Sequence, residues 1–233
     1  KLGDNVVNRS LQMPWYEGST LMFHLEHVHI SGDLNHVDCR LPVQYVIRPQ
    51  DDAYHDYRAY AGRIAGGVFR KGDKVMVLPS GFTSTIKTIN APEGEIKEAF
   101  APMSISLLLD DEIDISRGDM IVRENNSPQN SQDIDIMLCW LNEKKLQEGG
   151  RYIVKHTSRE VRCIVKEILY KIDISHLRRI ENETSFGVND IGRVVLRTTQ
   201  PLFFDSYRRN RNTGSLILID EGTNETVGAG MIV

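Results

Sequence analysis

The chain has 233 residues, enough for one large or two ordinary domains, and its 40% hydrophobic and 26% charged residues are typical of a globular protein. A formal net charge of −4 and a pI of about 6.0 argue against a protein whose main task is to grip nucleic acid electrostatically. Three scattered cysteines favour a reduced, cytoplasmic chain over a disulfide scaffold, and no apolar run reaches the about 18–20 residues that a membrane helix needs.

The first segment predicts one short helix. Leu21, Leu25 and Val28 recur at helical spacing, and the hydroxyl of Ser19 is placed to cap the first turn. We therefore predict a helix over residues 19–28, and we expect it to pack on a neighbour because an isolated helix of this length is marginal in water. Since the chain starts at Lys1 and not at methionine, we expect it to be cut from a longer protein.

Residues 37–124 alternate short apolar strands with glycine turns. Side chains alternate between the two faces of a strand, so Val43, Tyr45 and Ile47 are predicted to share one face. Gly66-Gly67 and the Lys-Gly-Asp at residues 71–73 are turn signals, because glycine takes positive φ at no steric cost. Short strands broken at this rhythm predict a closed antiparallel barrel.

A polar segment at residues 125–132 contains a proline and no apolar residue, which predicts a linker. Beyond it, Ile134, Ile136, Leu138 and Trp140 lie on one face of a strand, and further alternating strands follow. The predicted fold class is thus all-β, with two antiparallel β-barrels and a short N-terminal helix. The predicted domains are residues 1–31, 32–126 and 127–233.

Two motifs of the first barrel resemble a known family. Gly62-Arg63-Ile64, followed by the Lys-Gly-Asp of residues 71–73, resembles the start of the second domain of the translation-factor GTPases, as in elongation factor Tu. The resemblance implies a fold, domains II and III of that class, and it names no reaction.

The C-terminal end carries a more specific resemblance. Residues 212–220 read Asn-Thr-Gly-Ser-Leu-Ile-Leu-Ile-Asp, and residues 227–232 read Val-Gly-Ala-Gly-Met-Ile. This ending resembles the signature of the GTPase (large) subunit of bacterial two-subunit ATP sulfurylase, sulfate adenylyltransferase subunit 1, with Leu216 where phenylalanine is usual. Residues 3–18 and the helix after them also resemble the end of the GTP-binding domain in that family, and in elongation factor 1-alpha.

The resemblance implies a parent that couples GTP hydrolysis to synthesis of adenosine 5′-phosphosulfate from ATP and sulfate in sulfate assimilation. In that family a separate catalytic small subunit transfers the adenylyl group, so this chain is expected to be non-catalytic. The sequence contains neither Gly-x-x-x-x-Gly-Lys-Ser/Thr nor Asn-Lys-x-Asp. GTP and Mg²⁺ are therefore expected to bind a domain that precedes Lys1, of which residues 1–31 are the C-terminal remnant.

We predict no catalytic, cofactor-binding or metal-binding residue here. His24, His27 and His29 lie close in sequence but lack the spacing of a helical zinc site. Arginine and tyrosine are frequent interface anchors, and the one dense basic run supplies both. The candidate partner-binding residues are Tyr207, Arg208, Arg209 and Arg211. The expected partners are the catalytic subunit or the parent's own GTP-binding domain, and the alternative is an ordinary charged turn.

Two other functions stay open at this point. The chain could be domains II and III of a translation elongation factor that bind tRNA, although the acidic pI and the C-terminal signature weigh against this. It could also belong to a bifunctional parent in which an adenylylsulfate kinase follows Val233. No membrane partner is expected.

Overall fold

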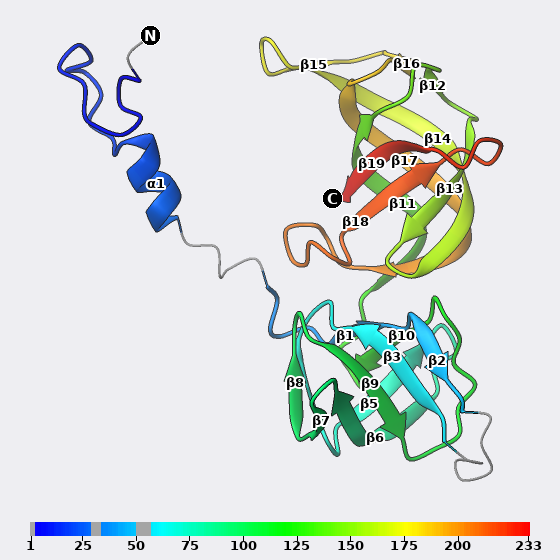
Figure 1. Ribbon diagram of the computed structural model, residues 1–233. Helices are drawn as coiled ribbons and strands as arrows, with labels where there is room; N and C mark the ends of the chain where they lie inside the picture. Colours follow the sequence, from blue (N-terminus) through cyan, green and yellow to red (C-terminus); the bar gives the residue numbers. More distant parts are fainter. Residues whose placement is uncertain (1–2, 29–33, 50–56) are drawn as a thin grey trace. The chain divides into compact units, whose positions relative to one another are not determined.

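The computed structural model describes residues 3–28, 34–49 and 57–233. The chain divides into two compact units, Lys1–Asp33 and Leu34–Val233. Within the described residues, the first unit holds the only helix, and the second unit consists of antiparallel strands joined by turns (Figure 1). The predicted all-β fold class is confirmed, whereas the domain bounds 1–31, 32–126 and 127–233 stay predictions.

Helix α1 (Leu21–His27) lies within the predicted range of residues 19–28 and is shorter than it. Its N-cap is Thr20 and not Ser19, because the hydroxyl of Thr20 accepts the amide of Phe23 at 3.3 Å. None of the residues of α1 is buried. The amides of Leu21 and Met22 donate to the carbonyls of Asn5 and Val6 at 2.9 Å, whereas the expected packing of this helix on a neighbour stays a prediction, and His29 lies outside the described residues.

The first barrel is built from ten short strands whose pairings are all antiparallel in the described residues. Its main sheet has the order β1-β10-β5-β6-β9-β3-β2 with β7 beside β6, and β4 pairs with β8. The strands are β1 (Arg40–Pro42), β2 (Tyr45–Ile47), β3 (Ala59–Arg63), β4 (Val68–Arg70), β5 (Lys74–Leu78), β6 (Thr83–Ala91), β7 (Gly94–Ile96), β8 (Glu98–Phe100), β9 (Ser104–Leu109) and β10 (Met120–Arg123).

The first barrel closes where β1 meets the residues after β3. Arg40 forms an isolated bridge with Gly66, and the amide of Ala65 donates to the carbonyl of Arg40 at 2.8 Å. Gly67 has φ +76°, and a Cβ there would lie 2.5 Å from the Cα of Cys39. The turn predicted at Gly66-Gly67 is thus confirmed, and it also lets two backbones approach closely.

The prediction that Val43, Tyr45 and Ile47 share one face of a strand is wrong. Val43 is buried, but Tyr45 is 67% exposed. The reason is a change of partner: β1 pairs with β10 and ends at Pro42, after which β2 begins at Tyr45 and pairs with β3. A single alternating pattern therefore does not run from Val43 to Ile47.

The second barrel is closed by regular pairing. Its strands run in the order β13-β18-β19-β11-β17-β14, and β13 also pairs with β14. In addition, β15 pairs with the end of β14, and β12 pairs with β16. The strands are β11 (Gln129–Trp140), β12 (Leu146–Gln147), β13 (Arg151–His156), β14 (Arg159–Asp173), β15 (Arg178–Ile180), β16 (Ser185–Phe186), β17 (Ile191–Phe204), β18 (Ser215–Ile219) and β19 (Thr226–Ile232).

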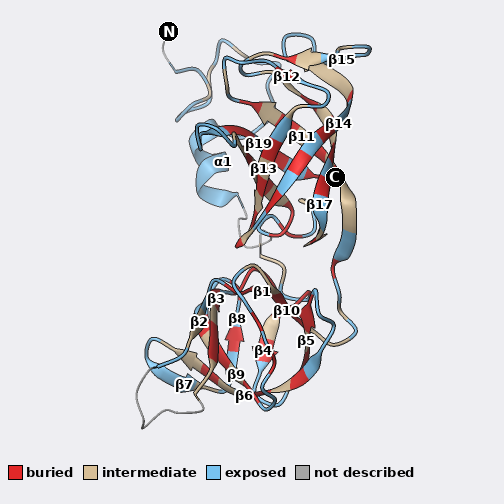
Figure 2. Cartoon of the chain, turned by 90° about the vertical axis from the view of Figure 1, so that its right-hand side faces the viewer, coloured by how far each residue is buried: buried red, intermediate tan, exposed pale blue. Residues whose placement is uncertain are grey.

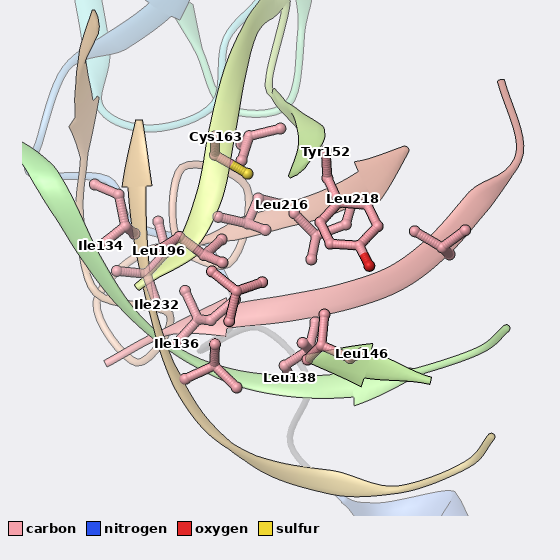
Figure 3. Packing of buried hydrophobic residues seen from close by; sticks show 14 of the residues in the cluster. Ile134, Ile136, Leu138, Leu146, Tyr152, Cys163, Leu196, Leu216, Leu218 and Ile232 are labelled. Carbon is pink, nitrogen blue, oxygen red and sulfur yellow. The ribbon is translucent and has the colours of Figure 1, made fainter. Parts of the chain in front are cut away.

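The two barrels have separate apolar cores. Buried positions recur along the strands of each barrel, as period-two alternation requires (Figure 2). In the second barrel Ile136 and Leu138 from β11 converge with Leu216 from β18 and Ile232 from β19 (Figure 3). The predicted inward face of β11 is confirmed, since Trp140 at its end is only 1% exposed.

The segment between the barrels is shorter than the polar pattern of residues 125–132 indicated. Strand β11 begins at Gln129, and its first residues pair with the end of β17, Gln129 opposite Phe204 and Ser131 opposite Leu202. The residues that open β11 are polar because they lie on an exposed or half-exposed ladder, with a register shift between Ser131 and Asp133. Because these residues are polar, the sequence analysis assigned them to a linker and not to a strand.

Candidate functional site

The basic run lies in a compact turn between β17 and β18, at residues 205–214. The amide of Tyr207 donates to the carbonyl of Ile232 at 2.9 Å, which ties the turn to the last strand. Inside the turn, the Oδ1 atom of buried Asn210 accepts the amide of Asn212 at 3.0 Å. Gly214 is required here, because a Cβ would lie 2.4 Å from the Cα of Tyr207.

Arg209 connects this turn to the first barrel. Its Nε and Nη2 atoms donate to the two carboxylate oxygens of Asp38 at 2.6 and 2.8 Å, a bidentate pair. Asp38 is 2% exposed and also accepts from the side chains of Asn126 at 3.0 Å and Asn35 at 2.7 Å. The hydrogen bond from Arg209 is the main reason why the pKa of Asp38 lies far below its ordinary value.

A second ion pair lies deeper, at the base of the same turn. Arg40 and Asp205 are 1% and 4% exposed, and two parallel hydrogen bonds of 2.9 and 3.0 Å join them. The hydroxyl of Thr213 donates to Asp205 at 2.7 Å, and Arg40 also donates to the carbonyl of Asn126 at 2.6 Å. Every charged group of this pair thus has hydrogen-bond partners, which is what a buried ion pair requires.

The other candidate residues face solvent. Arg208 and Arg211 are exposed, and Tyr207 is half-buried. The guanidinium of Arg211 lies 6.0 Å from the centre of the Tyr207 ring. The bidentate contact with Asp38 distinguishes Arg209 within the predicted set, and Tyr207, Arg208 and Arg211 form a surface suited to carboxylate or phosphate groups.

The structure has a second basic surface that the sequence analysis did not predict. In the register of the second barrel, Ile164 of β14 lies opposite Arg151 of β13 and opposite Arg197 of β17. These residues and Arg162 line a groove of about 340 Å³, with the 42% exposed Ile164 among the arginines. Three arginines from three strands leave no run in the sequence, and only the cross-strand register brings them together.

Potential metal ligands and cysteine thiols also occur among the described residues. No described group of three or more His, Cys, Asp or Glu side chains is placed to hold a metal ion. Burial raises the pKa of the Cys163 thiol to about 12, which keeps it protonated and unreactive. The sequence contains no phosphate-binding loop of the Gly-x-x-x-x-Gly-Lys-Ser/Thr form, and the expectation that GTP binds elsewhere in the parent stays a prediction. Among the described residues no helix is long and apolar enough to span a membrane.

Comparisons with known proteins agree with this geometry. The family model described as GTP-eEF1A C-terminal domain-like matches residues 133–233. A crystal structure of Sup35 complexed with GDP superposes with a TM-score of 0.76 at 19% identity, and the match covers 99% of this chain and 56% of that one. The chain therefore shares its fold with this Sup35 structure, and its residues 133–233 are similar to the C-terminal domain that the family model describes.

Relatives with curated names show more closely which proteins this chain resembles. The bifunctional enzyme CysN/CysC of Mycobacterium tuberculosis (strain ATCC 25618 / H37Rv) is 52% identical over 232 residues, 99% of this chain and 38% of the relative. Sulfate adenylyltransferase subunit 1 of Bacteroides fragilis (strain YCH46) is 44% identical over 231 residues, 99% of this chain and 48% of the relative. Nearly the whole chain is thus similar to sulfate adenylyltransferase subunit 1 and to CysN/CysC, and it spans about half or less of the length of these relatives.

Proposed function

We propose that this chain is the two-barrel region of a GTPase subunit of sulfate adenylyltransferase. The parent protein would couple GTP hydrolysis to the synthesis of adenosine 5′-phosphosulfate from ATP and sulfate. The observation that carries the proposal is the identity of 42% to 52% over 99% of the chain to relatives that bear this subunit's name or CysN/CysC.

The chemistry of the parent would lie elsewhere in the assembly. GTP and Mg²⁺ would bind a part of the parent outside these residues, and a separate catalytic subunit would transfer the adenylyl group. Support comes from the absence of a phosphate-binding loop in this sequence and from relatives more than twice as long as the matched segment. The three free cysteines fit a reducing compartment, so we place the parent in the cytoplasm.

The two barrels would act as a stiff platform between the GTP-binding domain and the catalytic subunit. Closed barrels leave no free sheet edge, and the ion pairs Arg40–Asp205 and Arg209–Asp38 fix the turn of residues 205–214 against the first barrel. A stiff connector transmits a change at one end because its own packing does not absorb the motion.

The test of the function is a reconstitution of the full-length parent with the catalytic subunit. Formation of adenosine 5′-phosphosulfate is measured with GTP, with a non-hydrolysable GTP analogue, and without nucleotide. We expect GTP to stimulate the reaction well beyond the analogue. Equal rates under all three conditions contradict the proposal, and GTP-dependent binding of aminoacyl-tRNA by the same preparation would favour an elongation factor instead.

Within this function, Tyr207, Arg208 and Arg211 are the proposed contacts to the catalytic subunit or to the parent's own GTP-binding domain. The exposure of Arg208 and Arg211 supports this, while the bidentate pair of Arg209 with Asp38 assigns that residue a structural task as well. The informative variant is Arg208→Ala with Arg211→Ala, which leaves Arg209 in place. Weaker association with the catalytic subunit in a titration supports the contact, and unchanged affinity together with unchanged GTP stimulation removes it.

A bifunctional parent is the second candidate. Relatives named bifunctional enzyme CysN/CysC are 52% and 48% identical to this chain, higher than the 44% of a relative named subunit 1. In such a parent an adenylylsulfate kinase would be joined to the sulfurylase subunit. Full-length protein that phosphorylates adenosine 5′-phosphosulfate with ATP establishes this form, and the lack of that activity in a protein with normal sulfurylase activity rejects it.

A further inference from the structure

Two consecutive residues of the second barrel carry buried hydrogen-bond donors without a partner. Ser158 is 8% exposed, and its hydroxyl makes no hydrogen bond in the structure. The Nε atom of Arg159, next in the chain, is also buried and unpaired. Orphaned buried donors cost free energy, and a neighbouring pair of them indicates a shared acceptor that belongs there.

Both residues line the same hollow. It measures about 380 Å³ and is bordered by Arg117 and Gly118 of the first barrel and by Ser158, Arg159, Glu160 and Gln200 of the second. The approach of the first barrel is close, because a Cβ on Gly118 would lie 3.5 Å from the Cα of Arg159. We call this space the Ser158 hollow.

The remaining hydrogen bonds around the Ser158 hollow leave further donor groups on its lining residues. Arg159 donates through Nη2 to the Oε1 atom of Gln200 at 2.8 Å, so the amide nitrogen of Gln200 is left as a donor. Arg117 donates to the carbonyl of Gln44 at 2.8 Å and has no carboxylate partner among the described residues. A hydroxyl, an amide and two guanidinium groups therefore surround the space.

Each of the two carboxylates near the hollow lies close to a basic side chain. Glu160, the one carboxylate on its wall, lies 3.1 Å from the ammonium of Lys155. Asp119 lies 3.9 Å from Arg159, and burial raises the pKa of its carboxyl above the ordinary value. The positive charge of Arg117 remains uncompensated by a described carboxylate, which favours an anion over a neutral molecule.

We infer that the Ser158 hollow is a binding site for a tetrahedral oxyanion, a phosphate or sulfate group. Such a group has acceptor oxygens in several directions, and it can take hydrogen bonds from the Ser158 hydroxyl, the Arg159 Nε–H and the Arg117 guanidinium at once. Because these donors come from both barrels, a bound oxyanion would hold the barrels together. The inference is independent of the proposed function, since it rests on the orphaned donors, the lining of the hollow and its charge balance.

The test uses the full-length protein saturated with GDP, so that any separate nucleotide site is filled. Sodium phosphate, sodium sulfate and ADP are titrated by calorimetry in a low-salt buffer, and melting temperatures are recorded with and without each anion. We expect saturable binding of an oxyanion and a higher melting temperature. Hydrogen bonds to charged groups are strong, so Ser158→Ala and Arg117→Ala should each weaken binding about tenfold or more.

The matched control is Arg70→Ala, which removes the same charge from an exposed ion pair with Glu98 outside the hollow. It should bind the oxyanion as the wild type does. If phosphate and sulfate bind alike, the site takes free oxyanions, and tighter binding of ADP that Ser158→Ala abolishes assigns the phosphate to a nucleotide. Absence of saturable binding, or equal affinity of Ser158→Ala and the wild type, overturns the inference and leaves the hollow to water.

Discussion

At the scale of single residues, the buried carboxylate of Asp38 depends on the side chains that donate hydrogen bonds to it. It accepts two hydrogen bonds from Arg209 and one each from Asn35 and Asn126, and its own side chain is 2% exposed. Arg209→Ala removes two of these donors and leaves a buried carboxylate short of partners. We expect a loss of about 1–3 kcal/mol in the free energy of unfolding, measured by urea denaturation.

Arg208→Ala is the control for this prediction. Arg208 is the preceding residue of the same turn and is exposed, so its replacement should change the free energy of unfolding by less than about 0.5 kcal/mol. If Arg209→Ala were as harmless as Arg208→Ala, the bidentate pair would contribute nothing measurable, and the whole basic run would be available for a partner.

His156 gives the protein a pH dependence. Its Nε2 atom lies 2.8 Å from the carbonyl oxygen of Thr213, and burial lowers the pKa of the imidazole below its ordinary value of 6.5. The folded protein therefore binds fewer protons than the unfolded chain just below pH 6.5, and stability falls as the pH drops through that value. We expect a lower urea midpoint at pH 5.5 than at pH 7.

The variant His156→Gln separates this residue from other titrating groups. Glutamine keeps a donor for the carbonyl of Thr213 but does not titrate, so the variant should lose much of the change in midpoint between pH 7 and pH 5.5. A wild-type midpoint that stays constant over this range would mean that His156 is not protonated on unfolding, and it would refute the assignment.

At the scale of elements, closure of the first barrel depends on Gly67. Gly67 and Gly81 both have φ +76°, but a Cβ on Gly67 would lie 2.5 Å from the backbone of Cys39, whereas Gly81 has open space. Gly81→Ala should therefore cost about 1 kcal/mol for its backbone conformation alone. Gly67→Ala should cost more than about 3 kcal/mol, because β1 must also move.

The test compares the free energies of unfolding of the two glycine variants, both measured by urea denaturation under identical conditions. Equal costs would show that the strand ends yield easily and that the first barrel is not tightly closed at this point. A larger cost at Gly67 identifies the close approach of Cys39 as the constraint.

The sequence predicted most elements because period-two alternation depends on local burial. Ile134, Ile136 and Leu138 are each 0% exposed, as their spacing indicated. It failed where a strand changes partner, at Tyr45, and where a strand is polar, at Gln129. Neither event leaves a local pattern, since the first depends on which strand lies alongside and the second on pairing without burial.

The candidate site, too, could be predicted only in part from the sequence. The basic run at residues 207–211 was visible because its members are adjacent, but its attachment to Asp38 spans 171 positions of sequence. The groove of Arg151, Arg162 and Arg197 and the Ser158 hollow are assembled from separate strands or separate barrels. Contacts of this kind follow from the tertiary register, which residue spacing alone does not encode.

At the scale of the whole molecule, the turn of residues 205–214 serves two purposes. It connects β17 and β18 of the second barrel, and through Asp205 and Arg209 it holds residues 38 and 40 at the start of the first. The described contacts place Leu34–Val233 in one compact unit. We therefore expect both barrels to unfold together, as a single cooperative body.

This coupling can be tested through Arg40. The pair Arg40–Asp205 is almost fully buried, so Arg40→Ala leaves the carboxylate of Asp205 without its counter-charge at a cost of about 3–5 kcal/mol. Trp140 reports on the second barrel, because it is 1% exposed within that core, while circular dichroism reports on strands of both. In the wild type the two signals should change at the same urea concentration, and in Arg40→Ala they should separate. Arg70→Ala breaks only an exposed ion pair and should keep them together. Signals that stay coincident in Arg40→Ala would show that other contacts join the barrels, and that this buried pair adds stability without coupling them.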